Sequence, residues 1–459
     1  MSLPELIEIV PLAKQVQAEI TVPGSKSITN RALILAALSE GETTLRGALW
    51  SEDTQVMVEG LRALGFAVKV TDDPQDVCNR TIAIQGLGGR IPRAGTLEEP
   101  LELFVGNAGT AARFLTALVC LGHGLYRVHG FKRMHERPQA ALFDALRELG
   151  YCIDSVNDRL PATIHGSGPR PRATCCVSIA ESSQFASALL LCAKVAKWHV
   201  TVVGQNAEES PYVAMTSKLM EAFPTRSGEF QVEPDASSAS YFWAASCVVP
   251  GGFWNPPRAA ELSAASLAPE DLQAWRMSEF SSHGSMVTVA HWPKSNWQID
   301  AAFVKYAELN PKLSSVSRCF HLGDSIMTLI TIAPLAQAPL KFVDLNRLRV
   351  QECERVTALR TELTGCGARV EEEGDTLFVY PSTLHGAEIE TYNDHRMAMC
   401  FAILGLAVPG IKIKNPACVK KTFPNFFQKL ATPPPHGLGA SVLDASTGRK
   451  LGVEELFAH

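Results

Sequence analysis

Charge is scarce in this chain and shows little bias toward either sign. Charged residues make up 19% of the 459 residues, and 42 Lys and Arg stand against 47 Asp and Glu, a formal net charge of −5. Such a chain has no general positive field to attract nucleic acid or anionic lipid. We therefore expect no nucleic-acid partner and no membrane partner, and any site for anions must be built locally.

Long hydrophobic runs are also missing. The longest, Met397 to Val408, ends at Pro409 after 12 residues, whereas a membrane-spanning helix needs about 20. The N-terminal segment carries Glu5 and Glu8 and lacks the apolar stretch of a secretory signal. These absences favour a cytoplasmic protein.

Cysteine pairs of the metal-binding kind are absent. None of the 12 cysteines forms a Cys-x-x-Cys pair, and only Cys175 and Cys176 are adjacent. With 46% hydrophobic residues, the chain can bury a large core. Scattered cysteines then indicate reduced, mostly buried thiols. We predict no metal site and no organic cofactor.

The chain does contain a repeated pattern of organisation. Six times, small polar or charged residues lead directly into an apolar stretch rich in Ala and Leu, which is typical of a helix N-terminus. The starts are spaced by about 459/6, or about 76 residues, which indicates stacked supersecondary units. The stretches are SKSITNRALILAALSEG from Ser25, NAGTAARFLTALV from Asn107, SSQFASALLLCAKVA from Ser182, DASSASYFWAASCV from Asp235, DSIMTLITIAPLA from Asp324 and NDHRMAMCFAILGLAV from Asn393.

A second element follows some of these helices. Residues 52–70, 138–154 and 354–372 each combine an amphipathic helix, a Gly-containing stop and a strand, and another strand comes next. Six units of this kind would form two lobes of an α/β protein. Residues 250–297 are rich in Trp, Pro, Gly and Ser and are predicted to be irregular or inserted, and a linker and a tail with a short helix are expected after Leu430.

The first helix start has the features of an anion site. Pro23 and Gly24 end a strand, and Lys26 and Arg31 lie at the positive end of the next helix. The segment is not a P-loop, and an ordinary capped helix with a solvated Lys is an equally good interpretation of this motif alone. Several such N-termini directed at one ligand would together favour a polyanion.

At this point the residues match a known family. The strings PGSKSITNRALILAAL, GNAGTAARFLTAL, RMHERP, SSQFASALL, DASSASYF, YNDHRMAM and KTFPNFF occur in the family's order. Over residues 15–430 the chain resembles the 5-enolpyruvylshikimate-3-phosphate (EPSP) synthases of the enolpyruvyl transferase family, which glyphosate inhibits. The resemblance is weak between about 250 and 320.

This resemblance implies a two-lobed α/β fold of six repeated βαβαββ units, an inside-out α/β barrel. Residues 1–24 and 236–430 would form the first lobe and residues 25–235 the second, with 431–459 as a C-terminal extension of unknown role. We expect a monomer.

The implied reaction adds the 5-hydroxyl of shikimate 3-phosphate to C2 of phosphoenolpyruvate and then expels phosphate. The resemblance assigns proton transfer and catalysis to Asp324, Glu352, Lys26 and His395. It assigns phosphoenolpyruvate binding to Lys26, Asn107, Gly109, Arg137, Gln184, Arg355, Arg396 and Lys421. It assigns shikimate 3-phosphate binding to Lys26, Ser27, Arg31, Ser182, Ser183, Gln184, Tyr212, Asp324 and Gln351.

Three positions depart from the family pattern. Gln351 stands where the family typically has Lys, Glu209 precedes the Pro-Tyr pair where Ser is common, and Phe114 replaces a frequent Pro. Two alternatives follow. One is a catalytically weakened homologue that binds an anionic metabolite. The other is a UDP-N-acetylglucosamine enolpyruvyl transferase, although residues 131–138 lack the Cys that this branch usually carries.

Overall fold

The chain folds into two compact units. The computed structural model describes residues 3–74, 76–204, 210–252, 286–308 and 315–459. Unit 1 contains Met1–Val22, Ala236–Lys294 and Ile299–His459, and unit 2 contains Pro23–Asp235 and Ser295–Gln298. The chain therefore leaves unit 1 two residues earlier than the expected boundary at residue 24, and 295–298 pack with unit 2.

Unit 2 contains three sheets and seven helices within the described residues. Its strands are β3 (Glu40–Leu49), β4 (Val68–Asp72), β5 (Asn79–Leu87), β6 (Leu101–Phe104), β7 (His123–His129), β8 (Cys152–Asp154), β9 (Ala162–Ser167), β10 (Thr174–Ser178), β11 (His199–Val203) and β12 (Arg226–Gln231). Its helices are α1 (Lys26–Leu38), α2 (Glu52–Ala63), α3 (Gly109–Val119), α4 (Lys132–Glu136), α5 (Ala140–Glu148), α6 (Ser183–Ala196) and α7 (Ser210–Ala222).

Unit 1 also contains three sheets within the part of the chain that is described. Its strands are β1 (Leu6–Ile9), β2 (Gln17–Ile20), β13 (Met286–Val289), β14 (Ser315–Ser317), β15 (Leu340–Val343), β16 (Val370–Glu373), β17 (Thr376–Val379), β18 (Glu388–Ile389), β19 (Ile411–Lys414) and β20 (Val442–Asp444). Its α-helices are α8 (Ala236–Val248), α10 (Phe303–Glu308), α11 (Ile326–Ile332), α12 (Arg355–Gly365), α13 (His395–Gly405) and α14 (Phe426–Ala431). Its 3₁₀ helices are η1 (Ile299–Ala302), η2 (Ala333–Leu335), η3 (Asn346–Val350), η4 (Pro416–Lys421) and η5 (Val453–Leu456).

The sheets share one topology. Each of the six contains one parallel strand pair, and four of them add two antiparallel strands in the orders β12-β3-β5-β4, β6-β7-β9-β8, β14-β15-β17-β16 and β18-β19-β1-β20. The other two, β10-β11 and β13-β2, have only the parallel pair among the described residues. The architecture is thus repetitive, while six complete βαβαββ units stay a prediction.

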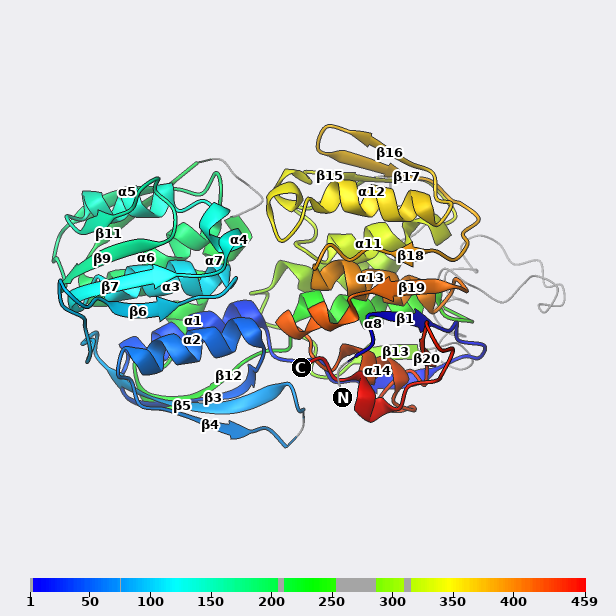
Figure 1. The fold of residues 1–459 in the computed structure, drawn as a ribbon, viewed down its shortest axis with the longest axis horizontal. Coiled ribbons are helices and arrows are strands. Elements are labelled where there is room, and N and C mark those ends of the chain that lie inside the picture. Colours follow the sequence, from blue (N-terminus) through cyan, green and yellow to red (C-terminus); the bar gives the residue numbers. More distant parts are fainter. Residues whose placement is uncertain (1–2, 75, 205–209, 253–285, 309–314) are drawn as a thin grey trace. The chain divides into compact units, whose positions relative to one another are not determined.

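The six predicted helix starts are confirmed as α1, α3, α6, α8, α11 and α13. In unit 2, α1, α3 and α6 pack against one another, and α8, α11 and α13 do the same in unit 1 (Figure 1). Each is buried along almost its whole length. This explains why their sequences are apolar all round rather than striped. A core of three helices therefore presents several helix N-termini within each unit.

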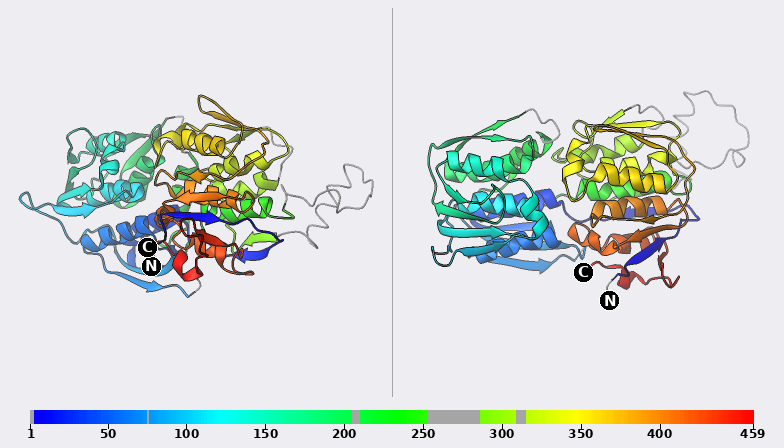
Figure 2. Two further views of the ribbon diagram at one scale, coloured as in Figure 1. Left: turned by 45° about the vertical axis from the view of Figure 1, so that its right-hand side comes forward. Right: turned by 45° about the horizontal axis from the view of Figure 1, so that its top comes forward.

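Two expectations need correction. The stretch predicted to be irregular includes strand β13, which pairs in parallel with β2, whereas 253–285 lie outside the described residues. The C-terminal segment is not a free tail, because β20 pairs with β1, and Leu438, Val442 and Leu456 are buried in the core of unit 1. In Figure 2 the red C-terminal segment lies against the blue N-terminal strand. Its predicted short helix is present as η5.

Most of the cysteines are buried, as the sequence predicts. Each of the twelve cysteines is a free thiol; Cys152 and Cys176 are exposed, Cys353 is half-buried and the others are buried. None of the described helices is both long enough and apolar enough to cross a membrane.

Candidate functional site

Lys26 opens helix α1 in unit 2. Its backbone N–H donates to Asp235 Oδ2 at 3.3 Å, and its Nζ lies 3.1 Å from Oδ2 of the buried Asp53. Gly24 has to be glycine here, because a Cβ would collide with the carbonyl oxygen of Gly47. The ammonium is thus held at a helix N-terminus with a carboxylate as its counter-ion, where an incoming anion could replace that carboxylate.

Arg31, one turn further along α1, faces the interior. Its Nε donates to Thr216 Oγ1 at 2.8 Å, one Nη to the Ser27 carbonyl at 2.9 Å and the other to Ser187 Oγ at 3.1 Å. Thr216 Oγ1 in turn donates to the Tyr212 carbonyl at 2.9 Å. Arg31 therefore joins α1 to α6 and α7 from inside the unit, and α7 itself had no counterpart in the sequence prediction.

The Asn107–Gly109 segment brings two guanidinium groups together at the start of α3. Arg137 donates to the Asn107 carbonyl at 3.3 Å, and Arg113 donates to the carbonyls of Gly109 at 3.1 Å and Pro138 at 2.8 Å. A Cβ on Gly109 would lie 2.7 Å from Arg137 and 2.8 Å from Arg113. A methyl group at position 109 would therefore push both guanidinium groups away from the helix N-terminus.

The segment before α5 is itself helical. Lys132–Glu136 form the short helix α4, which carries Arg133, and Arg137 follows directly after it. Arg133 pairs with Glu136 at 2.9 Å on the surface. Arg137, which follows α4, reaches the Asn107 carbonyl.

The start of α6 is capped as its sequence predicts. Ser182 Oγ accepts from the backbone N–H of Gln184 at 3.2 Å, and both Ser182 and Ser183 are buried. Within the described residues, the buried oxygens Asn107 Oδ1 and Gln184 Oε1 have no hydrogen-bond partner. Such oxygens are costly to bury unless a ligand or water satisfies them.

In unit 1, Asp324 lies just before α11 and collects positive charge. Its Oδ1 is 2.9 Å from Arg318, and its Oδ2 is 3.2 Å from Arg396 and 3.7 Å from Arg355. Burial by itself would raise the pKa of this carboxyl, but the charges of Arg396, Arg318 and Arg355 outweigh it and hold the pKa well below its usual range. Asp324 makes no side-chain cap for α11.

Glu352 lies between two cations. Its Oε1 is 2.9 Å from Lys421 Nζ and its Oε2 is 2.9 Å from Arg355. Arg355 is almost fully buried and also binds the fully buried Asp394, with Nε 2.7 Å from Oδ2. Asp394 caps α13 by accepting from the backbone N–H of Arg396 at 2.9 Å. One arginine thus couples both predicted proton-transfer carboxylates to the start of α13.

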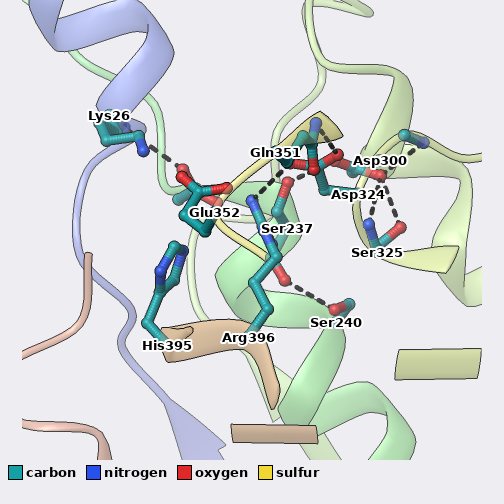
Figure 3. Close-up of polar contacts among 12 residues, drawn as sticks. Lys26, Ser237, Ser240, Asp300, Asp324, Ser325, Gln351, Glu352, His395 and Arg396 are labelled. Carbon is teal, nitrogen blue, oxygen red and sulfur yellow. Dashed lines mark hydrogen bonds and ion pairs between the residues drawn. The ribbon is translucent and has the colours of Figure 1, made fainter. Parts of the chain in front are cut away.

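Gln351 and His395 complete this cluster. Gln351 accepts a hydrogen bond from Arg355 and donates from Nε2 to Asp324 Oδ1 at 3.4 Å. His395 is the first residue of α13, is 1% exposed, and has Nδ1 3.8 Å from Asp394 Oδ1. Figure 3 shows Asp324, Gln351, Glu352, His395 and Arg396 converging from separate segments of unit 1.

Comparisons with known proteins identify the family of this chain. The family model described as EPSP synthase (3-phosphoshikimate 1-carboxyvinyltransferase) matches residues 11–226 and 224–430. A curated 3-phosphoshikimate 1-carboxyvinyltransferase of Opitutus terrae is 37% identical over 94% of this chain and 98% of its own length. One from Vibrio cholerae is 35% identical over 91% and 96%.

This chain belongs to the EPSP synthase family. Two solved structures share its fold: the EPSP synthase of Acinetobacter baumannii, with a TM-score of 0.64 at 21% identity over 95% of this chain and 99% of that one, and the enolpyruvyl transferase NikO of Streptomyces tendae, with a TM-score of 0.59 at 15% identity over 98% and 99%. The predicted two-lobed enolpyruvyl transferase fold is therefore confirmed.

The sequence analysis did not identify two residues beside Asp324. Arg318 and Asp300, both buried, contact Asp324 or the backbone beside it. Neither lies in a matched string, and Arg318 precedes Asp324 by six residues without any helical spacing to signal it. Glu209, the second departure from the family pattern, lies outside the described residues.

One group of side chains with metal-ligand chemistry occurs among the described residues. Cys152, Asp154 and His165 lie on the neighbouring strands β8 and β9 of unit 2, with ligand atoms within 4.8 Å of one another. The sequence reasoning missed it because only the strand register brings Cys152 opposite His165. Its Asp154–His165 pair, at 2.7 Å, already satisfies both groups, and none of the three is among the predicted site residues.

Proposed function

We propose that this chain is an active EPSP synthase, which transfers the enolpyruvyl group of phosphoenolpyruvate to the 5-hydroxyl of shikimate 3-phosphate and releases phosphate, in aromatic amino-acid biosynthesis. The observation that carries the proposal is the cluster of unit 1, in which Asp324 and Glu352 share Arg355. A protein that only binds an anion needs the cations. It does not need two carboxylates placed among them.

Phosphoenolpyruvate carries a phosphate and a carboxylate, so its binding requires several positive groups. In the proposal Arg355, Arg396 and Lys421 supply them from unit 1. Arg396 is only 12% exposed and Lys421 11%, so their charges are weakly screened. From unit 2 we assign Lys26, Arg137, Gln184 and the Asn107–Gly109 backbone to the same substrate, since Arg137 is held against Asn107 and Gly109.

Shikimate 3-phosphate is assigned to Ser27, Ser182, Ser183, Gln184, Tyr212 and Lys26, with Asp324 and Gln351 on its hydroxyl side. The unsatisfied oxygen of Gln184 supports a ligand that donates, and a sugar-like hydroxyl is such a donor. Arg31 is assigned to the same substrate; its hydrogen bonds to Thr216, to Ser187 and to the Ser27 carbonyl fix the guanidinium beside Ser27.

The chemistry divides between the two carboxylates. Because three guanidinium groups keep Asp324 ionised, it can accept the proton of the 5-hydroxyl as that oxygen bonds to C2. Glu352, in its protonated form, delivers a proton to C3. It takes a proton back from the C3 methyl group as the C2–O bond to phosphate breaks, and the departing phosphate carries away the proton that Asp324 accepted. Lys26 and His395 are assigned to stabilise the departing phosphate and to orient the reacting groups.

The first test is phosphate release from the full chain with both substrates. Phosphate appearing only when both are present supports the proposal, whereas binding without turnover favours the weakened homologue. Turnover with UDP-N-acetylglucosamine in place of shikimate 3-phosphate would favour the other transferase.

Substitutions test the proton-transfer roles. Asp324→Ala and Glu352→Ala should each lower kcat by about 10² to 10⁴, because a positioned acid or base contributes that much. Glu354→Ala is the matched control: Glu354 is two residues from Glu352 but caps α12 by accepting from the Thr357 N–H at 2.7 Å. It should lower stability by about 1 kcal/mol and leave kcat within a few-fold. A parental kcat in Asp324→Ala or Glu352→Ala would remove that residue from the mechanism.

We further propose that the protein is a cytoplasmic monomer that needs no metal or organic cofactor. The free thiols of all twelve cysteines support a reducing compartment. The light-scattering mass of the purified chain tests the monomer.

A further inference from the structure

A second carboxylate, Asp300, is buried beside the turn that presents Asp324. Asp300 belongs to η1 and is 4% exposed. Its Oδ1 accepts from the backbone N–H of Gly323 at 2.7 Å, from the backbone N–H of Ser325 at 3.1 Å and from Ser325 Oγ at 2.6 Å. Asp300 therefore holds the backbone on both sides of Asp324 with one oxygen.

The other oxygen of Asp300 ties this turn to helix α8. Asp300 Oδ2 accepts a hydrogen bond from Ser237 Oγ. The Ser237 carbonyl accepts from Ser240 Oγ at 2.6 Å, and that hydroxyl lies 2.9 Å from Thr328 Oγ1 on α11. Figure 3 shows Asp300 and Ser325 beside Asp324, and the hydrogen bond between Ser240 and Ser237. These contacts link the turn to α8 and, through Ser240, to α11.

The two neighbouring aspartates thus bind different partners. Asp324 directs its carboxylate at Arg318, Arg355 and Arg396, whereas Asp300 binds backbone N–H groups and hydroxyls. A buried charge is costly unless it is fully hydrogen-bonded. Four hydrogen bonds to Asp300 offset the cost of burying its carboxylate, and the same hydrogen bonds make the turn rigid.

We propose that Asp300 is a positioning residue for the proton-transfer step, fixing the Gly323–Ser325 backbone so that the Asp324 carboxylate faces the reacting hydroxyl. This inference rests on the proposed function. A misplacement of about 1 Å in a reacting group can lower the rate about 10²-fold. Removing Asp300 should therefore act on kcat through Asp324 and leave substrate binding largely unchanged.

The central variants are Asp300→Ala and Asp300→Asn. Asp300→Ala removes all four hydrogen bonds and should lower kcat about 10- to 100-fold, with the KM for shikimate 3-phosphate within a few-fold. Asp300→Asn should keep kcat within about 5-fold, because its amide oxygen can accept at Gly323 and Ser325 while its NH₂ donates to the Ser237 hydroxyl. The thermal midpoint of each variant is measured in parallel.

Glu362→Ala is the matched control for lost stability. Glu362 is also a buried carboxylate of unit 1, 8% exposed, and accepts from Tyr392 Oη at 2.7 Å and from the Glu390 N–H at 3.2 Å. It should lower the thermal midpoint without lowering kcat. If Asp300→Ala does not fold, Ser325→Ala replaces it with an expected several-fold loss of kcat. Its control is Ser382→Ala, which removes the hydrogen bond to the Tyr380 carbonyl at 2.8 Å and should keep kcat.

A double variant separates positioning from general damage. Added to Asp324→Ala, the Asp300→Ala change should lower kcat by less than about 2-fold, since no carboxylate remains to be positioned. If the two losses multiply, or if Asp300→Ala matches Glu362→Ala in kcat, the inference is overturned and the proposed function stands. A parental kcat in Asp324→Ala would instead overturn that residue's assigned role and the inference with it.

Discussion

Arg318 and Gln351 donate to the same oxygen of Asp324, and this predicts the effect of restoring the family's lysine. Arg318 lies 2.9 Å from Asp324 Oδ1 and Gln351 Nε2 lies 3.4 Å from it. Gln351 also accepts from Arg355, which a lysine could not do. We infer that Arg318 supplies here the positive charge that the family typically places at position 351. Arg349, two residues before Gln351, is engaged by Glu354, Glu372 and Asp375 instead.

The magnitude follows from the hydrogen bonds involved. A hydrogen bond to a charged group contributes about 1.5 to 3 kcal/mol, which corresponds to about 10- to 150-fold in rate or affinity. Arg318→Gln should therefore lower kcat/KM by that range. Gln351→Lys alone should not raise kcat/KM, and should lower it several-fold, because a second full charge would repel Arg318 and Arg355.

The decisive assay is steady-state kinetics of both single variants and of the exchange variant Arg318→Gln/Gln351→Lys. The exchange should recover at least 10-fold over Arg318→Gln, because it returns one cation to Asp324 Oδ1. If Gln351→Lys raises kcat/KM while Arg318→Gln has no effect, Arg318 does not replace the lysine. The relocation of charge would then be wrong.

Two further predictions use other parts of the site. Gly109→Ala should raise the KM for phosphoenolpyruvate about 10-fold, because a Cβ there displaces Arg137 and Arg113, whereas Gly365→Ala, whose Cβ meets no atom within 4 Å, should leave KM unchanged; equal KM values in both variants would contradict this. Chelation with EDTA should leave turnover unchanged, because no step of the proposed reaction uses Cys152, Asp154 or His165; activity lost to EDTA and restored by a divalent ion would contradict it.

The sequence predicted the elements of the fold better than their pairing. Apolar stretches that begin at Ser25, Asn107 or Asp324 identify helices because a buried helix needs capping polar residues and apolar residues all round. Strand β13 was missed because its four residues follow a segment with no readable pattern. The docking of the C-terminus was missed because β20 is stabilised by pairing with β1, more than 400 residues away in the chain.

The same division applies to the candidate site. Asp324 could be named from the sequence because it begins the apolar stretch DSIMTLITIAPLA, and Glu352 and Arg355 because the family resemblance assigns them. The structure brings the three together. Arg318 and Asp300 could not be named, because only the folded chain brings them against Asp324 and the backbone beside it. The anion contact of Arg31 stays a prediction, and the structure adds that this arginine joins α1 to α6 and α7 through Ser187 and Thr216.

The charges around Asp324 also make its basicity dependent on the substrates. In the free protein the net effect of Arg396, Arg318 and Arg355, acting against burial, is a pKa well below the usual value near 3.9. Its ion pairs therefore stabilise the fold above about pH 4, and that contribution is lost as the pH falls further.

A base with so low a pKa accepts protons poorly. When the phosphate and carboxylate of phosphoenolpyruvate share Arg355 and Arg396, those guanidinium groups stabilise the Asp324 carboxylate less, so its pKa must rise toward the range of an effective base. The acid limb of kcat, which reports the enzyme with substrates bound, should therefore lie at higher pH than the acid limb of kcat/KM, which reports the free enzyme. Asp324→Ala should abolish the difference. Acid limbs at the same pH, or a kcat limb at lower pH, would show that substrate binding does not release Asp324 from its cations.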